Sequence, residues 1–202
     1  MIFERLSGIF TSVIASTGYV GIFILMMLES MVAPVPSELV MPFAGFLVAD
    51  GKLNLWFVII VSVLASLAGS LISYFVAYFG EKELIHKFGR FVFLDKEELE
   101  WTEQWFQKRG SVTILISRFI PVIRHLISIP AGLGRMNLKR FILFTAVGAA
   151  AWNAFLLWAG MQLRERWELV RNYSTQLDAA IVIIIAIAVT FFIFKHWKRK
   201  RA

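Results

Sequence analysis

The sequence predicts an all-α integral membrane protein, folded as a single membrane domain over residues 1–202. Hydrophobic residues make up 58% of the chain and charged residues only 17%, a composition far too apolar for a soluble domain. Long uncharged stretches and two similar segments broken by prolines point to the same class. Because the chain has no cysteine, the sequence excludes disulfides, thiol chemistry and cysteine-ligated metals.

Three stretches are predicted to cross the membrane, at residues 55–79, 141–163 and 179–194. The first two are uncharged, and at 1.5 Å per residue each covers a hydrocarbon core of about 30 Å. The third is shorter but leads into a basic tail, residues 195–201, that can anchor it at the membrane surface. Residues 1–17 carry apolar side chains at helical spacing, which predicts an N-terminal interfacial helix.

Two proline-broken segments are predicted to form re-entrant hairpins. Their first apolar stretches, residues 18–32 and 111–120, are too short to cross the membrane. At a constant offset of 87 positions, five residues of one segment match five of the other: Pro34, Val35, Leu39, Ala44 and Gly45 align with Pro121, Val122, Leu126, Ala131 and Gly132. Proline lacks the backbone donor of a helix, so unpaired backbone groups are expected at Pro34, Pro36, Pro42, Pro121 and Pro130. Such backbone is tolerated at membrane depth only inside protein or along a wet cavity.

Each hairpin and the spanning helix after it form one predicted repeat, at residues 18–80 and 111–163. A cytoplasmic amphipathic linker, residues 81–110, joins the repeats, with Gly110 as the expected helix stop. Basic residues favour the cytoplasmic side, which places the C-terminus inside a plasma (inner) membrane. The first hairpin then opens to the exterior and the second to the cytoplasm. Such inverted repeats are typical of transporters that bind substrate at mid-membrane.

Four charged side chains fall within the predicted hairpins, Glu29 and Glu38 in the first and Arg118 and Arg124 in the second. A charge at the bilayer centre costs about 2.5–3.5 kcal/mol on insertion scales, so we expect these groups to pair, to face water, or both. A buried ion pair adds little stability over apolar packing, which favours a functional role. Arginine offers planar donors for phosphate oxygens, and a buried glutamate can change its protonation. We therefore expect Glu29 and Glu38 to carry protons, in a substrate site formed by Arg118, Arg124, Glu29, Glu38, Ser37 and His125.

One enzyme class, the membrane lipid phosphatases, shares a short pattern of residues with this sequence. Ser117 and Arg118 followed by His125 are similar to part of the signature of such enzymes. The spacing differs, however, and Ile129 stands where the signature has the aspartate that orients the histidine. The three histidines are scattered, and the basic residues do not gather on one soluble face. We therefore predict no catalytic residues, no metal, no cofactor and no nucleic-acid partner.

Three motifs occur together in this chain: Glu29-x4-Pro34-x-Pro36-Ser37-Glu38, Gly69-x4-Tyr74-x5-Gly80, and Arg118-Phe119-x-Pro121-x2-Arg124 with Ala131-Gly132. Over about residues 18–165 the combination resembles the DedA family of membrane proteins, also called the SNARE-associated or VTT-domain family. The resemblance implies lipid transport, by undecaprenyl phosphate translocases or phosphatidylethanolamine transporters in bacteria and by scramblases in eukaryotes. It also implies that the acidic pair and the arginine pair are needed for function. Many members have Asp or Asn where this chain has Ser70, so the resemblance carries no polar role to that position.

Three functions stay open at this point: a polyprenyl phosphate translocase, a flippase or scramblase for phosphatidylethanolamine or other phospholipids, and a membrane scaffold without transport. Two glutamates and two arginines make a site near neutral, to which a phosphate monoester adds roughly one to two negative charges. A glutamate can offset this charge by taking up a proton, whereas a zwitterionic phospholipid needs no such uptake. We therefore predict retrieval of undecaprenyl phosphate from the outer to the inner leaflet, coupled to a proton or sodium gradient. The sequence leaves a homo-oligomer open.

Overall fold

The computed structural model describes residues 12–31, 37–92 and 96–164, with the backbone alone described at 81–92, 96–99 and 121–122. In this part of the chain residues 12–17 are helical, and the remaining helices are α2 (Tyr19–Ser30), α3 (Ser37–Ala49), α4 (Leu55–Val92), α5 (Lys96–Ser117), α6 (Pro121–Leu126), α7 (Ser128–Leu133) and α8 (Leu138–Leu163). The described residues contain no strand, which confirms the all-α class. Residues 1–11 of the expected interfacial helix, and the expected span at 179–194, lie outside the described residues.

Two helices are long and apolar enough to cross a membrane, as expected. The stretch Leu55–Gly80 of α4 and the whole of α8 each have 26 residues. At 1.5 Å per residue they reach about 39 Å, more than the hydrocarbon thickness. Helices α2 and α3 have 12 and 13 residues and reach only about 18–20 Å, so neither is long enough to cross.

Both long helices begin at an asparagine cap. Asn54 Oδ1 accepts hydrogen bonds from the backbone N–H groups of Trp56 at 3.0 Å and Phe57 at 3.3 Å. Asn137 Oδ1 accepts one from the N–H of Arg140 at 3.2 Å. These bonds satisfy donors of the first helical turn that have no partner within the helix. Asn54 and Asn137 therefore define where α4 and α8 begin.

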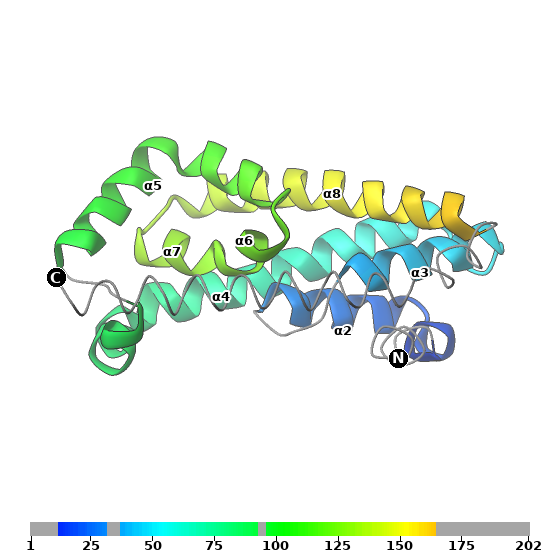
Figure 1. Ribbon diagram of the computed structural model, residues 1–202, viewed down its shortest axis with the longest axis horizontal. Coiled ribbons are helices and arrows are strands. Elements are labelled where there is room, and N and C mark those ends of the chain that lie inside the picture. The colour runs from blue at the N-terminus through cyan, green and yellow to red at the C-terminus, as the bar shows by residue number, and fades with distance from the viewer. Residues whose placement is uncertain (1–11, 32–36, 93–95, 165–202) are drawn as a thin grey trace, which may run out of the picture.

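The short helices fill opposite ends of a frame formed by α4 and α8 (Figure 1). Helices α2 and α3 lie at one end, and α6 and α7 lie at the other, with α5 bending over them. The packing is crossed: α2 packs on α4 and α5 on α8, whereas α3 packs on α8 and α7 on α4. One short helix of each half therefore packs against the long helix of the other half.

Two glycines that align in the sequence make the crossed contacts possible. A Cβ at Gly45 of α3 would overlap the carbonyl oxygen of Leu157 in α8, and a Cβ at Gly132 of α7 would overlap that of Tyr74 in α4. Only glycine lets the backbones approach this closely, as small residues do between membrane helices. The two contacts hold α3 and α7 against the frame.

The helix breaks expected from the sequence differ from those in the structure. Gly110 does not stop a helix, because α5 runs through it to Ser117, so that expectation was wrong. Pro42 lies inside α3, where the helix continues past the missing donor. Pro121 is the first residue of α6, a position at which proline's missing N–H costs nothing, and Pro130 lies within α7. Pro34 and Pro36 fall outside the described residues.

Candidate functional site

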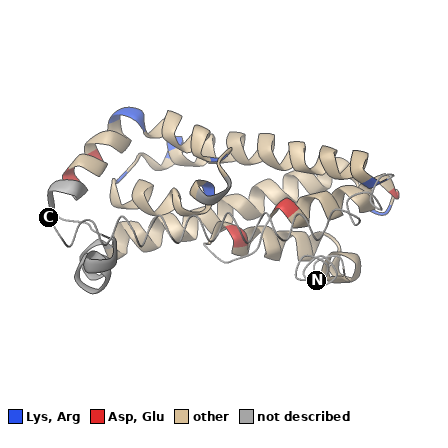
Figure 2. Ribbon diagram, in the orientation of Figure 1, with Lys and Arg blue, Asp and Glu red and all other residues tan. Residues whose placement is uncertain are grey.

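Arg124 of α6 contacts several polar and charged side chains in a cluster at the middle of the molecule. Figure 2 shows acidic positions of α2 and α3 and a basic position of α6 drawn together there. The Nη2 of Arg124 donates to Glu29 Oε1 and to Ser37 Oγ. It also lies 3.2 Å from Glu38 Oε1, without the alignment of a hydrogen bond. Arg124 thus contacts both Glu29 of α2 and Glu38 of α3.

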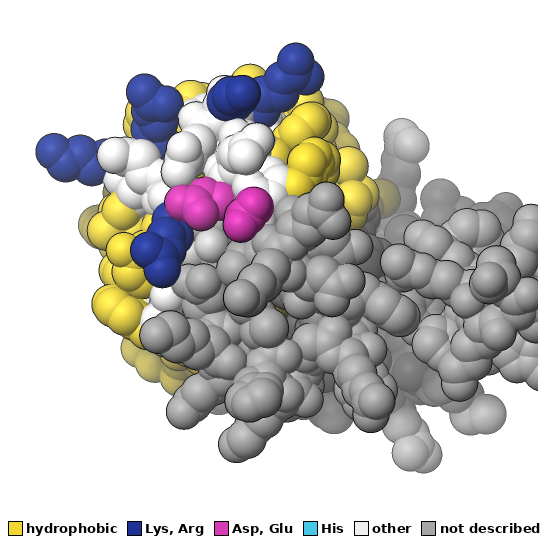
Figure 3. Space-filling view, turned by 90° about the vertical axis from the view of Figure 1, so that its left-hand side faces the viewer, with side chains coloured by type: hydrophobic (Ala, Val, Ile, Leu, Met, Phe, Trp, Pro, Cys, Tyr) yellow, Lys and Arg dark blue, Asp and Glu magenta, His cyan; other side chains and the backbone are white. Residues whose placement is uncertain are grey.

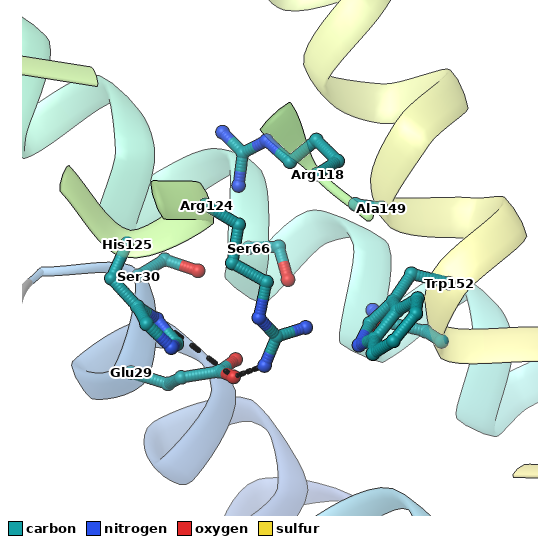
Figure 4. A pocket seen from close by; sticks show the side chains of 9 residues that line it. Glu29, Ser30, Ser66, Arg118, Arg124, His125, Ala149 and Trp152 are labelled. Carbon is teal, nitrogen blue, oxygen red and sulfur yellow. Dashed lines mark hydrogen bonds and ion pairs between the residues drawn. The ribbon is translucent and has the colours of Figure 1, made fainter. Parts of the chain in front are cut away.

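Glu29 is held in place from several sides (Figure 4). It is the penultimate residue of α2, and its Oε1 accepts the backbone N–H of Ser37 at 3.1 Å, at the start of α3. The first N–H groups of a helix have no partner within it, so a carboxylate there is favourable. His125 Nδ1 lies 4.0 Å from the same oxygen, and the guanidinium of Arg124 stands 5.3 Å from the ring centre of Trp152. The carboxylate, the imidazole and the indole therefore surround one guanidinium.

Arg118 is also buried but has different partners. Its Nη2 donates to Ser70 Oγ of α4 at 2.9 Å and lies 3.4 Å from Thr145 Oγ1 of α8. Gly148 of α8 leaves room for its side chain, because a Cβ there would meet the Cβ and Cγ of Arg118. Among the described residues no carboxylate forms an ion pair with it. Ser70, to which the family resemblance carried no polar role, therefore binds this arginine through its hydroxyl.

Both arginines border one small cavity. Its free space measures about 10 Å³, which is close to the least that one water molecule needs. Four buried donors at its wall have no hydrogen-bond acceptor among the described residues: Arg118 Nε, Arg124 Nε, Trp152 Nε1 and Asn153 Nδ2. Unsatisfied buried donors are rare and call for an explanation, such as a bound water or ion. The chemistry of this wall suits a small oxyanion.

The structure brings the six residues of the expected site together. Arg124, Glu29, Glu38 and Ser37 touch one another, while Arg118 and His125 line the same cavity. Four further residues contact Arg118 or line the cavity and were not predicted from the sequence: Ser70, Thr145, Trp152 and Asn153. An amide or a hydroxyl inside an apolar span is a signal that could have pointed to Asn153 and Thr145. A tryptophan in a membrane helix carries no such signal.

The two ends of the molecule differ in surface charge. At the end where α5 begins and α7 finishes, Figure 3 shows basic side chains around the outer edge. Exposed basic residues of α5, of the turn before α8 and of the first turn of α8 are Lys108, Arg109, Arg135, Lys139 and Arg140. At the other end, Asp50 is bonded to Arg164 and lies 3.8 Å from Lys52. Acidic side chains also appear on this face in Figure 3, but among the described residues of this end the basic side chains outnumber the acidic ones, Glu100 and Glu103, and we call it the basic end.

Comparison with known proteins defines the class of this fold and site. The family model for the VTT domain matches residues 35–162, and the chain belongs to the VTT-domain, or DedA, family of membrane proteins. It is 32% identical to undecaprenyl phosphate transporter A of Bacillus subtilis over 90% of both chains. It is 34% identical to undecaprenyl phosphate transporter A of Staphylococcus aureus, over 96% of this chain and 98% of the relative. An alkaline phosphatase-like protein of Lactococcus lactis is 35% identical over 89% and 88%. No solved structure matches the chain.

Proposed function

We propose that this protein carries undecaprenyl phosphate from the outer to the cytoplasmic leaflet of the plasma membrane together with a proton that moves in the same direction. The observation that carries the proposal is the cavity wall, where two arginines, an indole and an amide present buried donors that have no acceptor within the described part of the chain. A phosphate group has the oxygens to satisfy such donors. Two relatives that match nearly the whole chain are named undecaprenyl phosphate transporters, which supports this lipid.

The inverted-repeat topology is part of the proposal. In each half, a short helix packs on the long helix of the other half: α3 on α8, and α7 on α4. A twofold axis in the membrane plane would require such a match. Gly45 and Gly132 occupy matching places in the two contacts. Because basic residues favour the cytoplasmic side, we propose that the basic end, with α6 and α7, faces the cytoplasm and that α2 and α3 face the exterior.

Proton coupling follows from the competition for Arg124. Because the Nη2 group of Arg124 is bound to Glu29 and Ser37, a phosphate can bind that group only after the ion pair with Glu29 breaks. Protonation of Glu29 removes the charge that attracts the guanidinium and offsets the incoming negative charge. Loading is then favoured on the more acidic side, which is the exterior of an energised cell, and release is favoured inside. The cavity must widen for this step, since its present free space suits only a water molecule.

Reconstituted liposomes test the proposal. Purified protein should move undecaprenyl phosphate between leaflets, faster when the side of loading is the more acidic. The Glu29→Gln variant should lose this pH dependence, whereas Glu100→Gln, an exposed carboxylate of α5, should keep it. Equal transport of phosphatidylethanolamine, or transport that ignores the pH gradient, would instead support a phospholipid scramblase.

A phosphatase is the second candidate, because two relatives, both from Lactococcus lactis, carry the name alkaline phosphatase-like protein. The same liposomes discriminate the two functions. A translocase moves the lipid intact, whereas a phosphatase releases inorganic phosphate from it. Phosphate release that requires His125 would replace the transport proposal.

A further inference from the structure

An apolar groove runs along the outer side of the second half of α5. Its volume is about 570 Å³, within the usual range of sites for small molecules. Branched aliphatic side chains of α5, of the turn after it and of α6 form its wall: Val112, Ile116, Ile120, Ile123 and Ile127. The first four of these are between 42% and 59% exposed, so the groove opens to the surroundings of the helices. In a membrane those surroundings are lipid.

One end of the groove has polar groups. Trp105 and Arg109 line it there, with the guanidinium of Arg109 located 5.5 Å from the Trp105 ring centre. Trp105 Nε1 donates to Thr113 Oγ1 at 3.0 Å, which fixes the indole. Tryptophan and arginine are the residues that membrane proteins place at the lipid headgroup level. Arg109 also belongs to the basic end of the molecule, so its charge suits a lipid phosphate.

The other end of the groove reaches the depth of the charged cavity. Ile123 and Ser117 line the groove, and the next residues in the chain, Arg124 and Arg118, line the cavity. The same turn therefore has the cavity on its inner side and the groove on its outer side. Twelve helical positions from Trp105 to Ser117 span at most about 18 Å, roughly half of the hydrocarbon thickness.

We propose that this groove binds the isoprenoid chain of the carried lipid, with the lipid phosphate held at Arg109 at the basic end of the molecule. The inference rests on the function proposed above and adds a second position for the substrate, outside the cavity. A polyprenyl phosphate fits both parts of the groove, since its chain is branched and apolar and its single headgroup is anionic. In this position the lipid has left Arg124, whose Nη2 is bound to Glu29.

Photocrosslinking tests the site directly. A polyprenyl phosphate with a photoreactive group in its chain is added to the reconstituted protein, and the adducts are mapped by mass spectrometry. We expect adducts within residues 112–127, and Ile116→Trp, which fills the groove, should lower their yield about tenfold. Val147→Trp on α8 is the matched control, because Val147 is 50% exposed and Ile116 is 56% exposed. Adducts that lie elsewhere, or that persist in Ile116→Trp, would overturn the site.

A second pair of variants tests the phosphate position. Arg109→Gln should weaken binding of the probe about three- to tenfold, whereas Lys108→Gln, the same charge change one residue away and outside the groove, should leave it unchanged. Equal effects would show a nonspecific surface attraction and would contradict a phosphate position at Arg109. Inorganic phosphate at the same concentration should not displace the probe, because the chain supplies most of the contact.

The test also separates this inference from the transport proposal. Because the chain has no cysteine, a cysteine at Ile116 can be paired with single cysteines in residues 179–194. Complete disulfide formation would show that the chain itself covers the groove, and would overturn the inference without touching transport. Wild-type transport with no crosslinking in the groove would do the same. Crosslinking without any transport would instead keep the groove and remove the proposed function.

Discussion

Arg118 and Arg124 are buried on one cavity but contact different parts of the fold. Arg124 binds Glu29 and Ser37 and lies beside Glu38, so it joins α6 to α2 and α3. Arg118 binds the hydroxyls of Ser70 and Thr145, which belong to the two long helices. One arginine thus connects short helices of the two halves, and the other is bound to the two long helices.

This difference assigns the arginines different tasks. The guanidinium of Arg124 is already paired with carboxylates, so it has to exchange partners before it can bind an anion. We propose that this exchange controls when the cavity accepts phosphate. Among the described residues the hydrogen-bond partners of the Arg118 guanidinium are neutral hydroxyls, so we propose that Arg118 keeps its charge available and is the first residue to bind the phosphate. Variants at the two positions should therefore differ in kind as well as in size.

The largest effect is expected for Arg118→Ala. The variant removes the guanidinium and with it two or more charge-assisted hydrogen bonds to phosphate, worth about 1.5–3 kcal/mol each. Binding of undecaprenyl phosphate should weaken about 100-fold or more, measured by calorimetry in detergent. Arg164→Ala, which removes an exposed arginine at the far end, should bind normally. Near-normal affinity in Arg118→Ala would show that this residue is structural.

A smaller effect is expected for Arg124→Lys. Lysine keeps the charge but loses the planar fork that serves Glu29 and Ser37 now and phosphate later. Transport in liposomes should fall about tenfold, the loss of roughly one charge-assisted bond. The cavity should also widen more readily in this variant, because an ammonium group holds α6 to α2 and α3 less well than a guanidinium does. An unchanged transport rate would contradict direct contact between Arg124 and phosphate.

Ser70→Ala should have a weaker effect again. The hydroxyl orients Arg118 without touching the substrate, and its loss removes one hydrogen bond of about 1 kcal/mol. We expect affinity to fall about fivefold and the effect to vanish in an Arg118→Ala background, as a double-mutant cycle would show. Additive effects of the two changes would mean that Ser70 acts by another route.

The smallest effect on transport is expected for Tyr74→Phe. Its hydroxyl donates to the backbone oxygen of Met136 at 2.6 Å and ties α4 to the start of α8. Losing this buried bond should lower the free energy of unfolding by about 1 kcal/mol and the melting temperature by about 2–4 °C. Tyr78→Phe, at a partly exposed neighbour, is the control. A large loss of transport at unchanged stability would mean that the frame itself moves.

The sequence was sufficient for the parts of the fold that follow from composition. The two long apolar stretches and the charges inside the short ones were recognisable because a membrane penalises both broken helices and unpaired charges. Matching Ala-Gly pairs at an offset of 87 also identified Gly45 and Gly132, which the structure places at crossed helix contacts.

Other features depend on partners that no local pattern reveals. Gly110 continues a helix because α5 packs there against the turn before α8, where a Cβ would meet the side chain of Met136. Pro42 is accepted inside α3 because Gly160 of α8 leaves space for its backbone. The unequal pairing of the two arginines was also hidden, since it depends on which hydroxyls the long helices present to them.

Proton uptake on lipid binding is the most direct test of the central claim. Calorimetry in buffers of different ionisation enthalpy measures the protons taken up when undecaprenyl phosphate binds to the purified protein. We predict uptake of about one proton per lipid, because a near-neutral site accepts an anion. Binding should therefore weaken as the pH rises, Glu29→Gln should take up none, and phosphatidylethanolamine should cause no uptake. Full binding of undecaprenyl phosphate by the unmodified protein without proton uptake would contradict the coupling between Glu29, Arg124 and the transported phosphate.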